Sequence, residues 1–600
     1  MIKNISLLLL LFIANTINAQ EVFNLNDPHA SLQTEIHISK GKSASEFNSA
    51  QRVRELQINP ILQKKDQISI KDVIVLDLFN DKSFKAIVEN ISVDVNGVLL
   101  IRAKLLEYNY AYCLISSSNG KTFISIEIPE INELYRSKFD HQKNSYRLLQ
   151  IDKSKQVILE GGSPKIPPSK VQQKDNLKKK IQPEPLNPII DKNAAIKTEN
   201  VLNKPTVIND ENTQDIVTLL IVYTPAAAAW ATENETGINN TISMLMEKSQ
   251  LALNNSNSLL TLELVHTAEV DYTELDTGDD LDNLTYTSDG IMDNVHILRD
   301  AYAADLVILL GHISFTGGLA WLLNDSPENG GSPNYGFSLN RVQQASWTFT
   351  VVHEIGHNMG LGHSKIQNLQ PGPGFYDYSA GWRWTGNDDG KYCSVMAYKS
   401  GSNYDDGISH ARVPYFSNPS INHQGTPTGN AADGDSARSL RETKMAVSGY
   451  RVDNCIYPVD QVSSFTSSSI QNNSMTIGWT RGNGDSILVL ARAVDAINAD
   501  PLDRVSYTAN AAVGIGTQIG SENFVVYNGT GTSVDLTALA AGTTYNFALY
   551  EYTTTENCYL LAPLTGSALT TGCNVSFTYD TATFCADAAD PTPTITGLTG

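Results

Sequence analysis

The spacing of hydrophobic residues changes several times along the chain, and the first part reads as strands. Between residues 20 and 162, short apolar runs are rich in β-branched residues or alternate with period two, for example at 73–76, 91–95 and 123–128. Alternation over four to eight residues is typical of half-buried strands. We therefore expect a β-rich leader.

Residues 163–210 have no periodic apolar face. Pro167-Pro168, the lysines at 178–180 and the prolines at 183 and 185 lie among Gln, Asn and Lys residues. This composition indicates a polar linker, and exposed linkers are preferred sites of proteolytic cleavage. A strand-rich segment followed by a cleavable linker suggests a prosegment for whatever comes next.

Residues 211–452 alternate between strand and helix patterns, which predicts an α/β domain. We expect strands at 216–223, 260–270 and 306–310, and helices from 238, over 290–304 and over 346–359, the last ending at Gly360.

Helical spacing disappears again after residue 459. Over 459–572, short strands alternate with turns of Gly, Asn, Ser and Thr, which predicts a β-sandwich with Trp479 in its core. The stretch 536–547, which contains Tyr545, resembles the tyrosine-corner region of fibronectin type III domains. Residues 573–600 read as the start of a further β module, so we expect the chain to continue.

The N-terminus has the pattern of a secretory signal peptide over residues 1–19. Lys3 precedes an apolar run from Leu7 to Ile13, and Ala19 is a small residue suited to cleavage. No later apolar run approaches about 20 residues, so no transmembrane segment is expected. The sequence predicts a secreted protein, extracellular or at the cell surface.

Charge is divided unevenly along the chain. The formal net charge of −21 combines +5 over residues 1–210 with −26 over residues 211–600. A nucleic-acid partner is not expected, because phosphate binding needs clustered cations. The opposite signs suggest that a basic leader docks on an acidic enzyme, although solubility alone also explains an acidic surface.

Export permits disulfides among the six cysteines, and the sequence does not choose their pairing. Cys573 and Cys585 flank a short strand-like run and are candidates for a bond. Cys113 is the leader's lone thiol, and its apolar surroundings predict a buried, inert residue.

The stretch 353–363 contains the candidate metal ligands and a candidate general base. His353 and His357 are four residues apart, so in a helix they share one face. Gly360 lets the chain turn after the helix, and His363 then returns as a third nitrogen ligand. Three protein ligands leave a fourth position open, as a catalytic zinc requires. Glu354 lies beside the first ligand, where it can act as general base on the water that attacks the substrate.

This pattern, with both glycines and the third histidine, resembles the zinc-binding consensus of the metzincin metallopeptidases. The resemblance implies a Met-turn at Met396, 33 residues after His363, with Met396 as an apolar floor under the imidazoles. It also suggests that Tyr398 binds the metal or steadies the transition state. The alternative for Tyr398 is a packed aromatic.

Among metzincins, the chain over about 212–452 is most similar to bacterial adamalysin/reprolysin-like enzymes. The similarity rests on the segments 220–225, 289–293, 304–307 and 415–419. Ser364 departs from the Asp that reprolysins usually have after the third histidine, which leaves the subfamily open.

A second implication of the resemblance concerns substrate binding. Metzincins bind the substrate backbone on an edge strand upstream of the active helix. The stretch 316–321, which is rich in small residues, matches that position, and we expect a substrate to lie antiparallel on this edge at Gly318, Leu319 and Ala320. An ordinary Gly-rich turn is the alternative.

These observations predict a multidomain protein with an α/β metzincin catalytic domain (211–452), a β-rich prosegment (20–162), a linker (163–210) and a C-terminal β-sandwich (459–572). The predicted function is a secreted endopeptidase that uses one Zn²⁺ to hydrolyse proteins or peptides. The alternatives are a surface adhesin with a vestigial metal domain and a zinc hydrolase of non-peptide amides. Structural calcium, cleavage specificity and oligomeric state do not follow from the sequence.

Overall fold

The computed structural model describes residues 22–25, 35–37, 49–141, 143–168, 213–287, 289–453 and 455–572, with two short strands beyond them. The chain divides into two compact units. The first extends to Val295 and includes Ala304–Tyr450, and the second comprises His296–Ala303 and the chain from Arg451 onward. The predicted signal peptide, most of the predicted linker, Cys573 and Cys585 lie outside the described residues.

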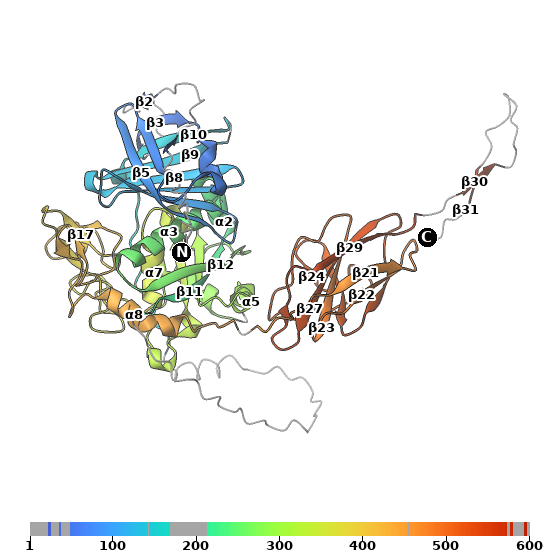
Figure 1. The fold of residues 1–600 in the computed structure, drawn as a ribbon. Coiled ribbons are helices and arrows are strands. Elements are labelled where there is room, and N and C mark those ends of the chain that lie inside the picture. Colours follow the sequence, from blue (N-terminus) through green and yellow to red (C-terminus); the bar gives the residue numbers. More distant parts are fainter. Residues whose placement is uncertain are drawn as a thin grey trace, which may run out of the picture. The chain divides into compact units, whose positions relative to one another are not determined.

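The leader forms one ten-stranded sheet, in the order β1-β4-β5-β6-β7-β8-β9-β10-β3-β2 (Figure 1). Its neighbours pair antiparallel except β1 and β4, which are parallel. The three segments predicted as strands fall in β4, β5 and β8. The elements are β1 (Val22–Asn24), β2 (Glu35–His37), β3 (Ala50–Leu56), η1 (Pro60–Gln63), η2 (Lys65–Gln67), β4 (Val73–Phe79), β5 (Lys82–Val93), β6 (Leu99–Leu105), β7 (Tyr112–Ser118), β8 (Lys121–Ile128), η3 (Pro129–Ile131), β9 (Glu133–Asp140), β10 (Ser145–Ile151) and η4 (Lys153–Lys155).

The next part of the first unit is an α/β layer built on a five-stranded sheet, ordered β12-β11-β13-β15-β14 (Figure 1). Its strands are β11 (Asp215–Tyr223), β12 (Leu260–Glu269), β13 (Leu306–Gly311), β14 (Gly318–Ala320) and β15 (Phe337–Arg341). All pairs are parallel except β14, which runs antiparallel to β15 at the edge of the sheet. Apolar side chains from this sheet and the helices over it form one core.

Of the three helices predicted over 211–452, two are shorter than predicted, whereas the helix expected from residue 238 begins at Ile238. The helices are α2 (Pro225–Glu235), α3 (Ile238–Asn255), α4 (Asp279–Thr285), α6 (Val342–Ala345), α7 (Thr350–Asn358) and α8 (Ser436–Val447), with 3-10 turns η5 (Pro327–Asn329), η6 (Pro333–Tyr335) and η7 (Gly401–Asn403). Most of α5 (Asp293–Ala301) belongs to the second unit. The helix expected from residue 346 begins only at Thr350, because the backbone of Phe349 is not helical (φ −101°, ψ 24°) and interrupts the helix before it. The helix expected over 290–304 is confined to 293–301, since Gly290 and Ala303 both have positive φ.

Two small sheets follow helix α7 in the chain. They comprise β16 (Arg383–Thr385), β17 (Lys391–Cys393) and β18 (Ala411–Arg412) in one sheet, and β19 (Asn422–His423) with β20 (Thr426–Pro427) in another. β18 pairs with β17 in parallel register and brings Arg412 beside Cys393.

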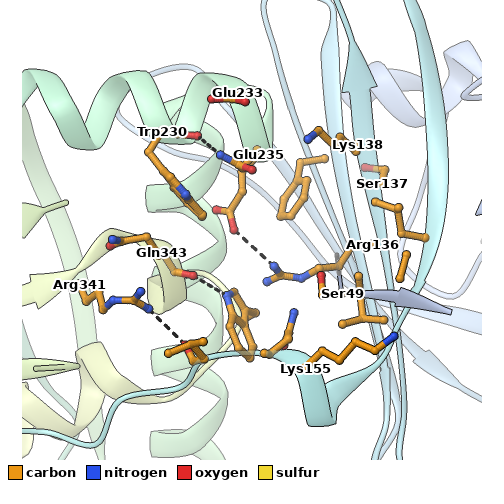
Figure 2. Close-up of a pocket in the computed structure, with 18 residues that line it drawn as sticks. Ser49, Arg136, Ser137, Lys138, Lys155, Trp230, Glu233, Glu235, Arg341 and Gln343 are labelled. Atoms are coloured by element: carbon orange, nitrogen blue, oxygen red, sulfur yellow. Dashed lines mark hydrogen bonds and ion pairs between the residues drawn. The ribbon is translucent and has the colours of Figure 1, made fainter. Parts of the chain in front are cut away.

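The leader sheet packs on α3 within the first unit. Met244 of α3 lies in one apolar cluster with Tyr112, Leu114 and Phe123 of the leader. A cavity of about 730 Å³ lies between the leader and α2, and Arg136 points across it toward Glu235 at 3.6 Å (Figure 2).

The charges at this contact only partly follow the expected polarity. Leader cations meet acids of the α/β part in the pairs Arg102–Glu247, Arg136–Glu235 and Lys165–Asp282. The pairs Glu127–Lys248 and Glu160–Arg412 have the opposite polarity. Specific pairing of both signs, rather than a basic surface on an acidic one, therefore holds the leader.

The sandwich of the second unit has two sheets, ordered β21-β22-β26 and β24-β25-β23-β27-β28, with β29 also pairing β27, and β30 and β31 form a separate two-stranded sheet (Figure 1). Side chains from both sheets share one core that includes Trp479, so the sheets pack face to face. The Tyr545 hydroxyl accepts a bond from the Ala540 N–H, and Cys455 is bonded to Cys558. The strands are β21 (Ser463–Ser468), β22 (Met475–Thr480), β23 (Ser486–Ala493), β24 (Gln518–Ile519), β25 (Asn523–Gly529), β26 (Ser533–Leu536), β27 (Thr544–Thr553), β28 (Cys558–Tyr559), β29 (Leu564–Leu569), β30 (Ser576–Tyr579) and β31 (Pro593–Thr596).

Over the part of the chain that the structure describes, no helix has the length and hydropathy needed to cross a membrane.

Candidate active site

Helix α7 positions the first two histidines of the site. His353 and His357 lie one turn apart on its buried face, and both are at most 2% exposed. The helix ends at Asn358, and Gly360 takes a positive φ of 87° that turns the chain back. His363 thereby reaches the same point and is also buried.

Backbone carbonyls orient all three imidazoles in the same sense. The Nδ1 atoms lie 2.9, 2.7 and 2.9 Å from the carbonyl oxygens of Val395, Leu361 and Gln370, respectively. Each Nδ1–H can therefore donate outward, and the three Nε2 atoms face one another.

The converging nitrogens have the spacing of a zinc site. His363 Nε2 lies 3.1 Å from His353 Nε2 and 3.2 Å from His357 Nε2. Two nitrogens bound tetrahedrally to one zinc at about 2.0–2.1 Å would be about 3.3 Å apart. The three side chains form the group of possible metal ligands found among the described residues.

The electrostatics of the cluster also suit a metal. Burial lowers the pKa of all three imidazoles, and the neighbouring rings lower it further for His353 and His357. The pKa of His363 falls to about 4. The rings are therefore neutral near pH 7, and neutral imidazole is the form that binds a metal.

Glu354 is fully buried beside this cluster. Among the described residues, neither of its carboxylate oxygens has a hydrogen-bond partner. Burial raises the pKa of this carboxyl well above its ordinary value, although Arg412 opposes the shift. A buried carboxyl without a partner is costly, and such groups are common where proton transfer is needed.

Met396 lies against α7, and Tyr398 lies beside His363. Met396 is buried in the core below α7, where a Cβ on Gly356 would come within 2.7 Å of its Sδ atom. Tyr398 lies beside the cluster, with its ring tilted by 49° against that of His363 and the two centroids 4.6 Å apart. Its hydroxyl is bonded to the Gly161 carbonyl oxygen and lies 2.6 Å from Gln370 Oε1.

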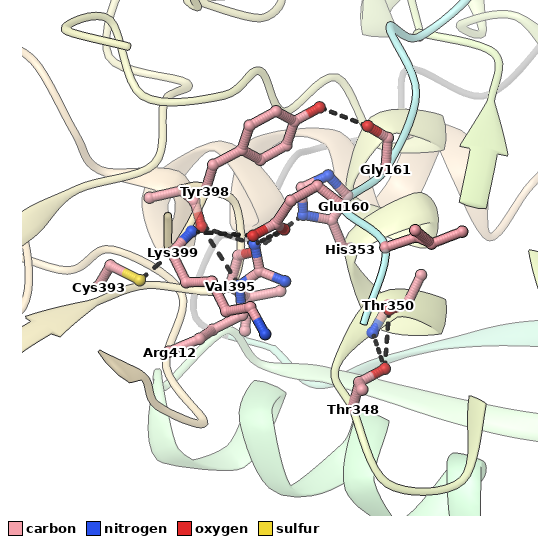
Figure 3. Close-up of polar contacts among 12 residues, drawn as sticks. Glu160, Gly161, Thr348, Thr350, His353, Cys393, Val395, Tyr398, Lys399 and Arg412 are labelled. Carbon is pink, nitrogen blue, oxygen red and sulfur yellow. Dashed lines mark hydrogen bonds and ion pairs between the residues drawn. The ribbon is translucent and has the colours of Figure 1, made fainter. Parts of the chain in front are cut away.

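The predicted substrate strand, β14, is an edge strand that already binds an extended peptide. That peptide is the end of the leader (Figure 3). Gly317 N–H donates to Glu160 O, Gly162 N–H to Gly318 O, Lys165 N–H to Ala320 O, and Leu322 N–H to Lys165 O, at 2.7–2.9 Å. Residues 163–168, expected in the linker, thus lie against the α/β part.

The bound leader segment runs parallel to β14. The pairing of Lys165 with Trp321 has parallel geometry, and the other bonds along the edge advance in the same direction on both chains. Gln344 clamps the front of the segment, since its side chain bonds both the N–H and the carbonyl of Leu159.

Gly161 is the leader residue nearest to the histidine cluster. A Cβ placed on it would meet Glu354 Oε1 at 2.7 Å and His353 Nε2 at 3.3 Å. The preceding residue, Glu160, turns its side chain the other way, onto Arg412 and the Lys399 N–H (Figure 3).

Residues 213–409, which include the histidine cluster, match the model of metallo-peptidase family M12 (Reprolysin_5). The chain carries an M12 metallopeptidase domain. This agrees with the resemblance drawn from residues 353–363.

Curated relatives of the M12 domain carry the name peptidyl-Asp metalloendopeptidase. The protein from Stenotrophomonas maltophilia strain R551-3 is 29% identical over 239 residues, which cover 39% of this chain and 52% of the relative. The protein from Xanthomonas campestris pv. campestris is 31% identical over 201 residues, covering 33% and 43%. The Pseudomonas aeruginosa protein is 28% identical over 256 residues, covering 39% and 40%. The chain thus spans about half the length, or less, of these relatives.

Sequence reasoning missed four residues that the structure places around the histidine cluster and β14: Glu160, Gly161, Gln344 and Arg412. Gly161 and Gly162 are adjacent glycines between the β-rich leader and the linker. Their position could have indicated a backbone segment that approaches another part of the chain closely. Gln344 and Arg412 belong to no sequence motif, so only the folded chain brings them to the histidine cluster and β14. We call the space between this cluster and β14, where residues 159–165 lie, the cleft.

Proposed function

We propose that the chain is a secreted zinc-dependent endopeptidase that its own leader holds latent. The observation that carries this proposal is the combination of three converging Nε2 atoms with an unpartnered buried carboxylate, beside an edge strand that binds an extended peptide. The family match and the relatives' name support a metalloendopeptidase.

His353, His357 and His363 would hold the metal. Zinc, when bound, supplies Lewis-acid chemistry that activates water and polarises the scissile carbonyl. The carbonyls of Val395, Leu361 and Gln370 fix each ring by its Nδ1–H, which keeps Nε2 free to bind.

Glu354 moves the proton in this mechanism. Its carboxylate oxygens, which lack partners in the described structure, accept a proton from the attacking water and pass it to the amine that leaves. Because burial raises the pKa of the Glu354 carboxyl, its ionised form accepts a proton more readily than an exposed carboxylate does.

The substrate backbone would replace the leader on β14, in antiparallel orientation. Gly318 lets the Glu354 side chain pack directly against this strand, because a Cβ there would lie 2.4 Å from Glu354 Oε1. The Tyr398 hydroxyl, which donates to the Gly161 carbonyl, would donate to the scissile carbonyl as charge develops on its oxygen.

Latency follows from occupation of the cleft by residues 159–165. The segment is parallel to β14, so its peptide bonds run in the direction opposite to that of an antiparallel substrate. Cys113 lies in the leader core at β7, fully buried, and burial raises the pKa of its thiol. These facts favour inhibition by a leader segment that covers the cleft over inhibition by a Cys113 thiolate bound to the metal.

The test compares the uncut full chain, the chain cut within residues 171–210, and the cut chain carrying Glu354→Gln. We expect internal cleavage of a protein substrate only by the cut wild-type chain. An adhesin would instead bind a target with equal affinity in all three forms and cleave nothing. The relatives' name also supports cleavage next to an aspartyl residue.

A further inference from the structure

The side chain of Lys165 lies in a small pocket just beyond the end of β14. Its ammonium nitrogen lies 2.8 Å from Asp282 Oδ1 and donates to the Gly278 carbonyl oxygen at 2.8 Å. The same nitrogen lies 5.7 Å from the centre of the Trp321 ring. A carboxylate, a carbonyl oxygen and an aromatic face thus surround one cation. We call these three groups, from Gly278, Asp282 and Trp321, the lysine pocket.

The lysine pocket belongs entirely to the α/β part of the chain. Asp282 lies in α4, and Gly278 directly precedes that helix. The Trp321 indole is tied to the same helix, because its Nε1–H donates to Thr285 Oγ1 at 2.8 Å. None of these connections involves the leader. We therefore expect the pocket to keep its shape when the leader leaves the cleft.

Asp282 needs a cation from outside the α/β part. Among the described residues, its carboxylate has no hydrogen-bond or ion-pair partner other than Lys165. The side chains of Lys165 and Asp282 are 27% and 32% exposed, so the pair is partly shielded from water. A partly shielded carboxylate beside an aromatic face is a favourable site for an ammonium or guanidinium group.

The place of the lysine pocket along the edge strand sets which substrate residue it contacts. Gly161, at the reactive centre, lies between the leader residues that bond Gly317 and Gly318. Lys165 pairs with Trp321, three to four residues further along the same edge. The leader runs parallel to this edge, whereas a substrate is expected to run antiparallel. The edge beyond Gly318 therefore faces the part of a substrate that precedes the cleaved bond. If the scissile carbonyl takes the place of the Gly161 carbonyl, the pocket lies beside the fourth or fifth residue before that bond.

We propose that the lysine pocket is a substrate subsite for a lysine or arginine side chain on the fourth or fifth residue before the cleaved bond, and that Lys165 occupies it in the latent chain. The inference rests on the proposed endopeptidase function and names a class of substrate, namely peptides with a basic residue upstream of the cleaved bond. One carboxylate then serves both latency and substrate choice.

The first experiment measures preference in the chain cut within residues 171–210, with both pieces retained. In otherwise identical peptides, the fourth or the fifth residue before the cleaved bond is Lys, Arg, Gln or Glu, and mass spectrometry assigns the bond that is cut. The ratio of kcat/KM between two peptides does not depend on how much enzyme is free of leader. We expect Lys and Arg to be preferred over Gln by about 5- to 20-fold at one of the two positions, the combined range for a partly exposed ion pair and a cation–π contact. Glu at that position should be worse than Gln.

Substitutions at Asp282 should change that ratio specifically. Asp282→Asn should remove the preference for Lys, and Asp282→Lys should reverse it, so that Glu is preferred. The loss should appear in KM with kcat unchanged, because the pocket contacts the substrate away from the reacting atoms. Asp279→Asn is the matched control. Asp279 is an exposed acid in the first turn of the same helix but outside the pocket, so its loss should leave the ratio unchanged.

The second experiment needs no catalysis by the chain itself. In the uncut full chain, an added protease that does not cut at lysine reports how often residues 157–168 leave the cleft. Lys165→Gln should speed this cleavage by about 5- to 20-fold when Asp282 is present, and by less than about 3-fold in Asp282→Asn. Glu160→Gln, which removes the separate pair with Arg412, should act equally in both backgrounds.

The two experiments separate the possible failures. If no peptide is cut but Lys165 and Asp282 remain coupled, the endopeptidase function is wrong and the lysine pocket stands as a binding site. If peptides are cut without a basic preference at either position, or with one that Asp282→Asn preserves, the subsite assignment is wrong. Absence of coupling in the protease experiment also overturns it.

Discussion

Adding one methyl group at Gly161 should release the leader from the cleft. A Cβ at this position would lie 2.7 Å from Glu354 Oε1 and 3.3 Å from His353 Nε2, whereas ordinary contacts begin at 3.4 Å. Gly161 does not adopt a positive φ, so alanine suits its backbone and the penalty comes from the overlap alone. The overlap is met only in the latent state, because the leader is absent from the cleft of the active enzyme.

The size of the effect follows from overpacking. Forcing an extra methyl group into a filled site costs about 1–3 kcal/mol. That range corresponds to roughly a 5- to 150-fold increase in the fraction of chains with an open cleft. The Glu354 side chain can rotate to relieve part of the clash, which favours the lower half of the range.

The assay compares peptide hydrolysis by the uncut full chain with hydrolysis by the same chain after cleavage within residues 171–210. Gly161→Ala should raise the uncut rate by the factor above and leave the cut rate unchanged. Ser163→Ala, at an exposed position of the same segment, is the control and should stay latent. If Gly161→Ala remains as silent as wild type while the cut chain is active, the cleft occupation described here does not cause latency.

Four further predictions concern the site and its leader. Removing zinc with a chelator should abolish peptide hydrolysis and zinc should restore it, with one zinc per chain by elemental analysis; full activity in a metal-free sample would contradict the metal assignment. Glu354→Gln should retain zinc but lose roughly 10²–10⁴-fold in kcat, whereas wild-type turnover would give Glu354 another role. Tyr398→Phe should lower kcat more than it raises KM, and unchanged kinetics would leave Tyr398 as packing. Acid should loosen the leader: burial opposes the charge on Glu127, but Lys248 and Lys153 outweigh it and hold the pKa of that carboxyl at about 2. Ionised Glu127 therefore stabilises the leader fully above pH 4.5, the ordinary pKa, and this stabilisation is lost as the pH falls toward 2. The sensitivity of residues 157–168 to an added protease will report the loss. An unchanged pH profile in Glu127→Gln would show that Glu127 is not its source.

The local part of the site was predictable from sequence because helix geometry converts spacing into position. His353 and His357 share a face in any helix, and a glycine at 360 was a sufficient signal for the turn that returns His363. The strands at 216–223 and 306–310 were predicted for a similar reason, since apolar runs that are buried on both faces leave a continuous pattern. The start of α7 was not predicted, because the spacing of apolar residues does not reveal the non-helical backbone of Phe349.

The leader's hold on the cleft was decided only by the tertiary structure. Glu160 and Arg412 are 252 residues apart in the chain, and neither lies in a periodic or motif-bearing stretch. Sequence patterns record which face of an element is buried but not which distant element covers it. The sequence by itself therefore determined the order of elements and the candidate ligands of the metal. The fold decided what fills the cleft, in which direction it runs and which buried charge it neutralises, because those depend on long-range packing that no local spacing encodes.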